Sequence, residues 1–234
     1  MKITWYGHCC FLLNHHEVDI LTDPYDNFLN IELGHIESDI MTVSSIWHDH
    51  GNIAASPHAH IYAYEGTYSR NGVIITGIKS QEARGSSNII YNIQVEANSV
   101  TNFADWGEQD SIKNFTDKET EILSETDIAF VRANAIDDDE QQFFYDLAFT
   151  VSHPKVIIPC HYFPESFIRK EIPEDEQDGY LKKLDQIDKM ANRLGYSKKI
   201  NEGYELVPDF DQNTDPVMVV FNEIHPQVRY VEQD

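Results

Sequence analysis

The sequence predicts an α/β fold, in which one domain spanning residues 1–234 has sheets inside and helices outside. Three observations predict it. Short apolar segments typical of strands fill the first half, strand-like and helix-like segments alternate in the second, and no Pro/Ser-rich linker separates the halves. A chain of 234 residues is long enough to bury a large core.

The first half is expected to consist of strands. Short apolar segments recur there at roughly ten-residue intervals, bounded by Gly, Asn, His or Asp-Pro, a pattern typical of an antiparallel sheet or sandwich. The pair Asn71-Gly72 is a strong hairpin signal. The expected strands are "KITWYG", "CFLLNH", "VDILTDP", "DIMTVSS", "HIYAYEG", "GVIITGI", "NIIYNIQV" and "SVTNFAD".

The second half is expected to alternate between helices and strands. "DKETEILSE" and "EQQFFYDLAFTVSH" predict helices, whereas "DIAFVRA", "KVIIPCH" and "PVMVVFNEI" predict buried strands. The clearest helix is "EDEQDGYLKKLDQIDKMANRLG", whose apolar residues recur at three- and four-residue steps. Gly195 follows the last of them and is expected to end this helix.

Composition excludes several classes of protein. The formal net charge of -23 argues against nucleic-acid binding, because little positive charge is left to neutralise phosphates. No apolar run reaches the roughly 20 residues of a membrane helix, and the opening "MKITWYGHCC" does not resemble a secretory signal. We therefore expect a cytoplasmic protein that acts on a small-molecule substrate, binds no membrane, and could form a homo-oligomer. Cys9, Cys10 and Cys160 are expected to be buried reduced thiols.

Candidate metal ligands follow three of the predicted strands. Asp49 and His50 come after "DIMTVSS", Asp105 after "SVTNFA", and His161 after "KVIIPC". Loops at strand ends could bring these side chains together at one edge of a sandwich. Carboxylates and imidazoles are ligands of divalent transition metals. Each position alone is a weak signal, whereas the set predicts a metal site.

The chain resembles the metallo-β-lactamase superfamily, specifically its branch of small bacterial and archaeal metal-dependent hydrolases that includes ascorbate-6-phosphate lactonase. The resemblance rests on "MKITWYGHCCFLL", "ILTDPYD", "TVSSIWHDHGN", "NGVIITGIKS", "RGSSNIIY", "VTNFADWG" and "PKVIIPCHY", which follow the family's order. It implies a four-layer αβ/βα sandwich with the site at one edge of its two sheets. The region from about residue 164 matches the family only loosely.

The resemblance implies one metal site and not two. In the family a loop of the form His-x-His-x-Asp-His supplies ligands to two metals, and a later Asp bridges them. The second site is preserved here as Asp49, His50 and His161, with Asp105 in the bridging position. The first site is altered, because its ligand positions are occupied by Ser45, Trp47 and Glu82. Asn102 and Ala104 are further departures, standing where relatives often have His and Gly.

The substitutions have physical consequences. A serine hydroxyl is a poor ligand, and an indole has no lone pair to offer. If the loop is extended, residues 45, 47 and 49 point the same way, so the indole of Trp47 is expected to fill the volume of the first metal. The preserved set offers two imidazoles and two carboxylates, to which Glu82 could add a third. Such ligands suit one Zn, Mn or Fe ion.

Other residues near the motif have less certain roles. His48 could turn inward if the loop is kinked, or it could face solvent. His8 and Asp23 match family positions near the site, and as second-shell residues they could orient a ligand histidine; a hydrogen-bonded pair at strand ends is the alternative. Tyr162 and Trp106 are expected to flank the pocket. His15 and His16 show no convergent partner in the sequence and are expected to be structural or exposed.

Two functions follow from the sequence. The first is a metal-dependent hydrolase of lactones, esters or phosphoesters that uses a single metal, with Asp49 or Glu82 as the catalytic carboxylate that handles the proton. The second is an inactive relative that keeps the fold and acts as a binding or scaffold protein, as the four replacements at residues 45, 47, 82 and 102 would allow.

Overall fold

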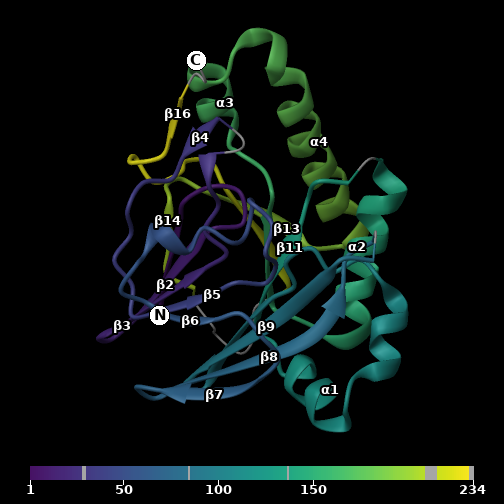
Figure 1. The fold of residues 1–234 in the computed structure, drawn as a ribbon. Coiled ribbons are helices and arrows are strands. Elements are labelled where there is room, and N and C mark those ends of the chain that lie inside the picture. The colour runs from purple at the N-terminus through teal and green to yellow at the C-terminus, as the bar shows by residue number, and fades with distance from the viewer. Residues whose placement is uncertain (28–29, 84, 136, 209–214, 232–234) are drawn as a thin grey trace.

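A computed structural model describes residues 1–27, 30–83, 85–135, 137–208 and 215–231 (Figure 1). Its strands form two large sheets and one small one. The six-stranded sheet has the order β14 (Glu205–Leu206), β1 (Lys2–Trp5), β2 (Phe11–His15), β3 (Val18–Thr22), β5 (Ile40–Thr42), β6 (His60–Tyr62). A two-stranded sheet pairs β16 (Arg229–Tyr230) with β4 (Ile31–Glu32).

The eight-stranded sheet combines strands from both halves of the chain. Its order is β13 (Ser197–Asn201), β15 (Val217–Phe221), β12 (Val156–Cys160), β11 (Ile128–Arg132), β10 (Asn98–Asn102), β9 (Ser87–Val95), β8 (Val73–Gln81), β7 (Gly66–Arg70). The hairpin of β7 and β8 turns at Asn71-Gly72, both with positive φ, as the sequence predicts.

Strand direction is mixed in both large sheets. The strands β1 to β3 and β7 to β10 pair antiparallel, as expected for the first half. However, β3, β5 and β6 pair parallel, and so do β10, β11, β12, β15 and β13. Since parallel strands end at the same edge of a sheet, the loops after β10 and β12 emerge together. This topology brings residues distant in sequence to one edge.

The α-helices lie in the second half of the chain. They are α1 (Asp117–Ser124), α2 (Asp138–Val151), α3 (Glu165–Glu171) and α4 (Gln177–Leu194), and short 3-10 turns span Ile53–Ala55, Gln109–Asn114 and Glu174–Glu176. Thr116 caps α1 in a reciprocal capping box with Glu119. Gly195 ends α4 with φ 69°, as the sequence predicts. Among the described residues, no helix is long and apolar enough to cross a membrane.

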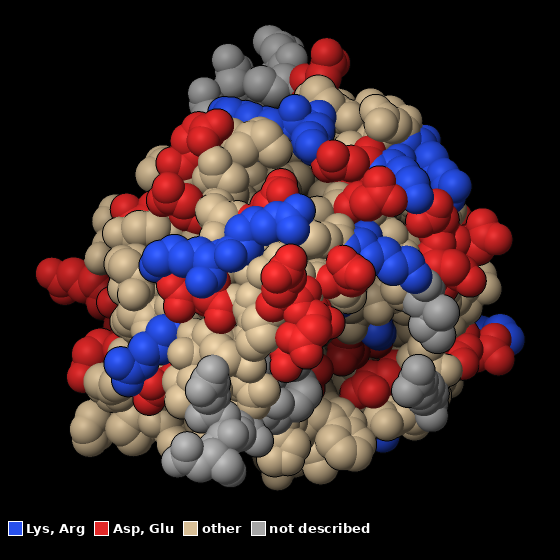
Figure 2. Space-filling model, turned by 90° about the horizontal axis from the view of Figure 1, so that it is seen from above, with Lys and Arg blue, Asp and Glu red and all other residues tan. Residues whose placement is uncertain are grey.

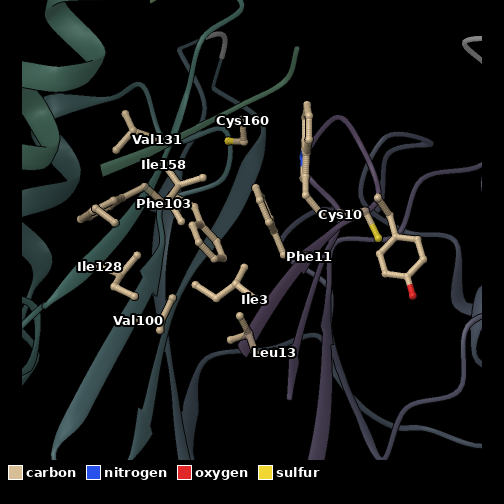
Figure 3. Packing of buried hydrophobic residues seen from close by; sticks show 14 of the residues in the cluster. Ile3, Cys10, Phe11, Leu13, Val100, Phe103, Ile128, Val131, Ile158 and Cys160 are labelled. Atoms are coloured by element: carbon tan, nitrogen blue, oxygen red, sulfur yellow. The ribbon is translucent and has the colours of Figure 1, made fainter. Parts of the chain in front are cut away.

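The core lies between the two large sheets. Ile3, Phe11 and Leu13 of the six-stranded sheet face apolar residues of the eight-stranded sheet (Figure 3). The rings of Phe11 and Phe130 stack with centroids 4.1 Å apart, which joins the two sheets directly. The free cysteines Cys9, Cys10 and Cys160 are buried, as expected. The sandwich and its outer helices confirm the expected α/β fold.

Several short elements have no clear sequence signal. The edge strand β13 reads "SKKIN" and is largely exposed, so it lacks an apolar pattern. The helix α3 and the strands β4, β14 and β16 are short, and their pairing is decided by distant parts of the chain.

Candidate metal centre

Four side chains converge where the two large sheets meet. The ligand atoms of Asp49, His50, Asp105 and His161 all lie within 4.8 Å of one another. The Nε2 atom of His50 lies 3.1 Å from Asp105 Oδ2, 3.6 Å from Asp49 Oδ2 and 3.3 Å from His161 Nε2. The sequence analysis named these four residues as metal ligands, and the structure places them together. That they bind a metal is still a prediction.

The four residues come from both sheets. Asp49 and His50 lie in the loop after β5 of the six-stranded sheet, whereas Asp105 follows β10 and His161 follows β12 of the eight-stranded sheet. The loop after β5 closes in a tight turn, in which the backbone N–H of His50 donates to the carbonyl of Trp47 at 3.0 Å. The thiol of Cys9 donates to the carbonyl of Asp49 at 2.7 Å and so stabilises the turn.

Asp23 holds His50 in place. Its carboxylate is fully buried and accepts hydrogen bonds from the backbone and hydroxyl of Ser44, at 2.8 and 2.9 Å, and from Asn102 Nδ2 at 2.7 Å. Its Oδ2 also lies 3.2 Å from His50 Nδ1. A carboxylate facing Nδ1 favours a proton on that nitrogen, which leaves the lone pair of Nε2 directed at the cluster. Ser44 Oγ lies 3.1 Å from the same nitrogen and is a second partner for that proton. That Asp23 orients a ligand histidine stays a prediction.

His8 packs against His161. Their ring centroids are 4.4 Å apart, and the backbone N–H of His161 donates to the carbonyl of His8 at 2.9 Å. His8, Asp23, Ala104 and His161 all have positive φ, between 42° and 65°. Non-glycine residues seldom adopt this conformation, and where they do the strain is often concentrated at functional sites.

The electrostatics of the cluster suit a cation. Burial lowers the pKa of His161 well below its ordinary value, so its imidazole is neutral and has a free lone pair. Burial opposes ionisation of Asp105, but His161, His50 and Arg132 together hold its pKa well below the ordinary range. For His50, burial is outweighed by the neighbouring Cys9, Asp105 and Asp23, which raise its pKa, so without a metal this imidazole holds a proton that a metal bound at Nε2 would displace.

One ligand atom of the cluster, Asp105 Oδ1, is buried and has no hydrogen-bond partner among the described residues. Asp105 Oδ1 lies 3.3 Å from both His161 Nε2 and Arg132 Nη1, yet among the described residues it accepts no hydrogen bond of acceptable geometry. An unsatisfied buried carboxylate oxygen is costly. A cation between this oxygen and the two Nε2 atoms would satisfy all three. The residues present therefore fit one divalent metal.

Trp47 does not fill the position of a first metal, and the expectation that it would was wrong. Its side chain is 51% exposed and lies beside a groove of about 300 Å³ that Tyr64 and Lys79 also line. The expectation assumed an extended loop with alternating side chains, whereas residues 47–50 form a turn. His48 is exposed and its Nδ1 contacts Asp26, so it faces solvent and not the cluster.

Glu82 lies next to the cluster but outside it. The hydroxyl of the buried Ser45 donates to Glu82 Oε1 at 3.3 Å, so two of the altered first-site positions contact each other. Burial is the main reason that the pKa of Glu82 is raised, and the charge of Asp105 adds to it. Glu82 is thus a carboxyl group close to the site that holds its proton more tightly than an exposed glutamate does.

Several surrounding residues differ from expectation. Tyr162 is fully buried, and its hydroxyl hydrogen-bonds to Phe221; Trp106 is 3% exposed and stacks on Phe103. Both are core residues, so the expectation that they would flank the pocket was wrong. The rings of His15 and His16 do have a partner, since both contact Glu96 in the turn between β9 and β10.

Sequence reasoning missed two cations at the site. Arg132 ends β11, donates from Nη1 to the carbonyl of Asp105 at 3.1 Å, and stacks on Phe144 with its Cζ 4.2 Å from the ring centroid. The sequence signal available for Arg132 was that a charged residue ends a buried strand, and that the two neighbouring strands lead to candidate ligands. Lys183 of α4 also acts electrostatically on Asp105 and Asp49. It stands among the many charged residues of an amphipathic helix, so the sequence gives no signal for it.

Comparison with known proteins identifies the family. A family model described as a beta-lactamase superfamily domain matches residues 2–161. The match covers more than half of the chain, so the chain belongs to the metallo-β-lactamase superfamily, as the motifs indicated. A search of curated proteins gives no match.

Solved structures show the same fold. A protein from Thermotoga maritima, described as a candidate Zn-dependent hydrolase of the metallo-β-lactamase superfamily, is 26% identical with a TM-score of 0.62; the alignment covers 96% of this chain and 99% of that one. A mutant of the CmlA β-hydroxylase is 11% identical with a TM-score of 0.54, and the alignment covers 97% of this chain and 53% of that one. Human tRNase Z, short form, is 8% identical with a TM-score of 0.50 over 69% of this chain and 92% of that one.

Proposed function

We propose that this protein is a hydrolase of a small ester, lactone or phosphoester, and that it uses one divalent metal held by Asp49, His50, Asp105 and His161. The observation that carries the proposal is the convergence of four ligand atoms around the unsatisfied Asp105 Oδ1. The similarity to the Thermotoga maritima protein over nearly the whole chain supports it. Zn, Mn and Fe ions all suit this set of two imidazoles and two carboxylates.

The chain supplies defined roles around such a metal. The metal would polarise the carbonyl or phosphoryl oxygen and lower the pKa of water. Asp23 orients His50 through Nδ1, and His8 packs on His161, so both imidazoles are held in one orientation. Glu82 lies outside the ligand cluster and has a raised pKa, so we assign it the transfer of the proton, while Asp49 serves as a ligand.

Metal analysis and kinetics test this assignment. Purified protein is loaded with Zn²⁺, Mn²⁺ or Fe²⁺ in turn and assayed with p-nitrophenyl esters, a γ-lactone and bis-p-nitrophenyl phosphate. We expect about one metal per chain, lost in His161→Ala and Asp49→Ala. Glu82→Gln should keep its metal and lose activity by about 10²–10⁴-fold, the usual range for a proton-transfer residue. His58→Ala, in an exposed turn, is the matched control.

The alternative is a binding or scaffold protein without catalytic activity. Its support is the loss of first-site ligands at Ser45, Trp47 and Glu82, together with the exposure of Ile46 and Trp47 beside the site, at 93% and 51%. Well-folded protein that takes up none of the three metals would favour this alternative. Protein that binds a metal through the four named ligands but hydrolyses none of the substrates would also do so.

A further inference from the structure

Lys183 is a partly buried cation on α4. Among the described residues it forms neither a hydrogen bond nor an ion pair, and its Nζ lies 5.6 Å from the ring centroid of Tyr180. The chain has 40 acidic residues, so partners for a lysine are abundant. A partly buried, unpaired ammonium in such a protein is therefore a candidate for binding an anion from outside the chain.

The start of α4 is connected to the metal centre by a row of aromatic rings. Tyr180 contacts Phe163 with centroids 5.9 Å apart, Phe163 lies 6.1 Å from the ring of His8, and His8 packs on His161. Burial is the main reason that the pKa of Lys183 is lowered, and Arg132 adds to it, while Asp105 and Asp49 oppose it. Lys183 is thus close enough to the site to interact with its charges.

The other cation at the site is already engaged. Arg132 lies 3.3 Å from Asp105 Oδ1, bonds to Asn134 through Nε, and rests on Phe144. Asp23, Asp49, Glu82 and Asp105 supply four negative charges at most, and Arg132, Lys183 and a divalent metal would supply four positive ones. The loaded site would therefore be close to neutral even though the protein as a whole is strongly acidic.

We propose that Lys183 binds an oxyanion group of the substrate, and that the substrate is a small ester, lactone or phosphoester bearing a carboxylate or phosphate away from the bond that is cleaved. This inference rests on the proposed function and adds the substrate's charge to it. Viewed from above, the molecule has a hollow in which basic and acidic side chains lie side by side below the surface (Figure 2).

Lys183 lies outside the part of the chain that the family model matches. The family domain matches residues 2–161, whereas α4 spans Gln177–Leu194. The metal ligands thus lie within the part that the family model matches, and Lys183 lies beyond it, although the Thermotoga maritima structure aligns with 96% of this chain. Binding energy from a remote charged group on the substrate can be used to position the reacting bond at the metal centre.

A matched pair of substrates tests the inference. Metal-loaded protein is assayed with p-nitrophenyl butyrate, which is neutral, and with mono-p-nitrophenyl succinate, which is similar in size and anionic. We expect kcat/KM to be higher for the succinate ester by about tenfold or more, corresponding to about 1.4 kcal/mol. Lys183→Met should remove that preference mainly through KM, so that kcat/KM falls more for the succinate ester than for the neutral ester, while Lys183→Arg should retain most of the preference. Lys182→Met, which alters the exposed neighbouring lysine, is the control.

The outcomes separate the two proposals. If the wild type hydrolyses the two esters with equal kcat/KM, and Lys183→Met does so too, the proposed role of Lys183 is wrong and the hydrolase proposal stands. If the wild type hydrolyses neither ester, titration calorimetry of metal-loaded protein with succinate and inorganic phosphate decides the anion site, and the hydrolase proposal is contradicted if the γ-lactone and bis-p-nitrophenyl phosphate are not hydrolysed either. The wild type should bind at least one of them about tenfold more tightly than Lys183→Met; equal affinity, with unchanged thermal unfolding, would overturn the anion site.

Discussion

At the scale of single residues, Asp23 connects the candidate ligand His50 to the surrounding protein. It accepts three hydrogen bonds, contacts the Nδ1 atom of His50, and is fully buried in a left-handed backbone conformation. Asp23→Asn changes the shape little but replaces an acceptor with a donor that faces Ser44. We expect metal affinity to fall about 10–100-fold, as is typical when a carboxylate behind a ligand histidine is lost.

Competition with a chromogenic chelator measures that affinity. The control is Asp19→Asn, which alters an aspartate of β3 that accepts a hydrogen bond from Asn14. Equal metal affinity in wild type and Asp23→Asn would show that the contact with His50 does not orient the ligand.

Trp47 offers a contrasting prediction at the same scale. Because its side chain is half-exposed and outside the metal cluster, Trp47→Ala should change the free energy of unfolding by no more than about 0.5 kcal/mol and leave the metal content unchanged. Urea denaturation and elemental analysis check this. A variant that gained a second metal would show that the indole excludes one.

Some of the site residues could be predicted from the sequence and others could not. The order and spacing of the family motifs were enough to select Asp49, His50, Asp105 and His161, which the fold then brings together. The side-chain directions in the loop after β5 could not be predicted, because they depend on a turn at residues 47–50. Arg132 and Lys183 act across distances in sequence that no local pattern records.

At the scale of elements, α4 has one glycine inside it and another immediately after its last residue. Gly179 lies within the helix and Gly195 ends it with φ 69°, and a Cβ atom at either position would meet no atom within 4 Å. Gly179→Ala should stabilise the protein by about 0.5–1 kcal/mol through helix propensity, whereas Gly195→Ala should destabilise it by about 1–2 kcal/mol through left-handed strain.

Urea denaturation of the two variants gives the comparison, and each serves as the other's control. If both variants change the free energy of unfolding in the same direction, the left-handed helix end at Gly195 is contradicted. Elements with strong periodicity, such as α4 and the buried strands, were predictable from sequence. By contrast, β13 and α3 were not, because their stability comes from the partners they pack on.

At the scale of the whole molecule, the proposed metal joins the two large sheets. Its ligands come from the loop after β5 on one side and from the ends of β10 and β12 on the other. A ligand that binds only the folded state stabilises it by mass action, by about 2.7 kcal/mol at a hundredfold excess over its Kd. Metal removal should therefore lower the Tm by about 5–10 °C for a chain of this size.

Calorimetric scans with and without a chelator measure the effect. His161→Ala should unfold at a similar temperature in both conditions, because it lacks a ligand. A chelator-dependent shift of equal size in wild type and His161→Ala would mean that the stabilising ion is bound elsewhere. The sandwich itself was predictable from the sequence, whereas this coupling between its sheets depends on strand directions that were expected to be mostly antiparallel.

The pairing of β12 with β15 has a practical consequence. β12, which leads directly into His161, is an interior strand only because β15 and then β13 continue the sheet beyond it. Expressing residues 2–161 alone would remove β15 and β13 and leave one hydrogen-bonding edge of the apolar strand β12 without a partner strand. An uncovered strand of this kind invites intermolecular association, so such a truncated product should precipitate, and a soluble protein that carries the four candidate ligands needs the last seventy or so amino acids attached.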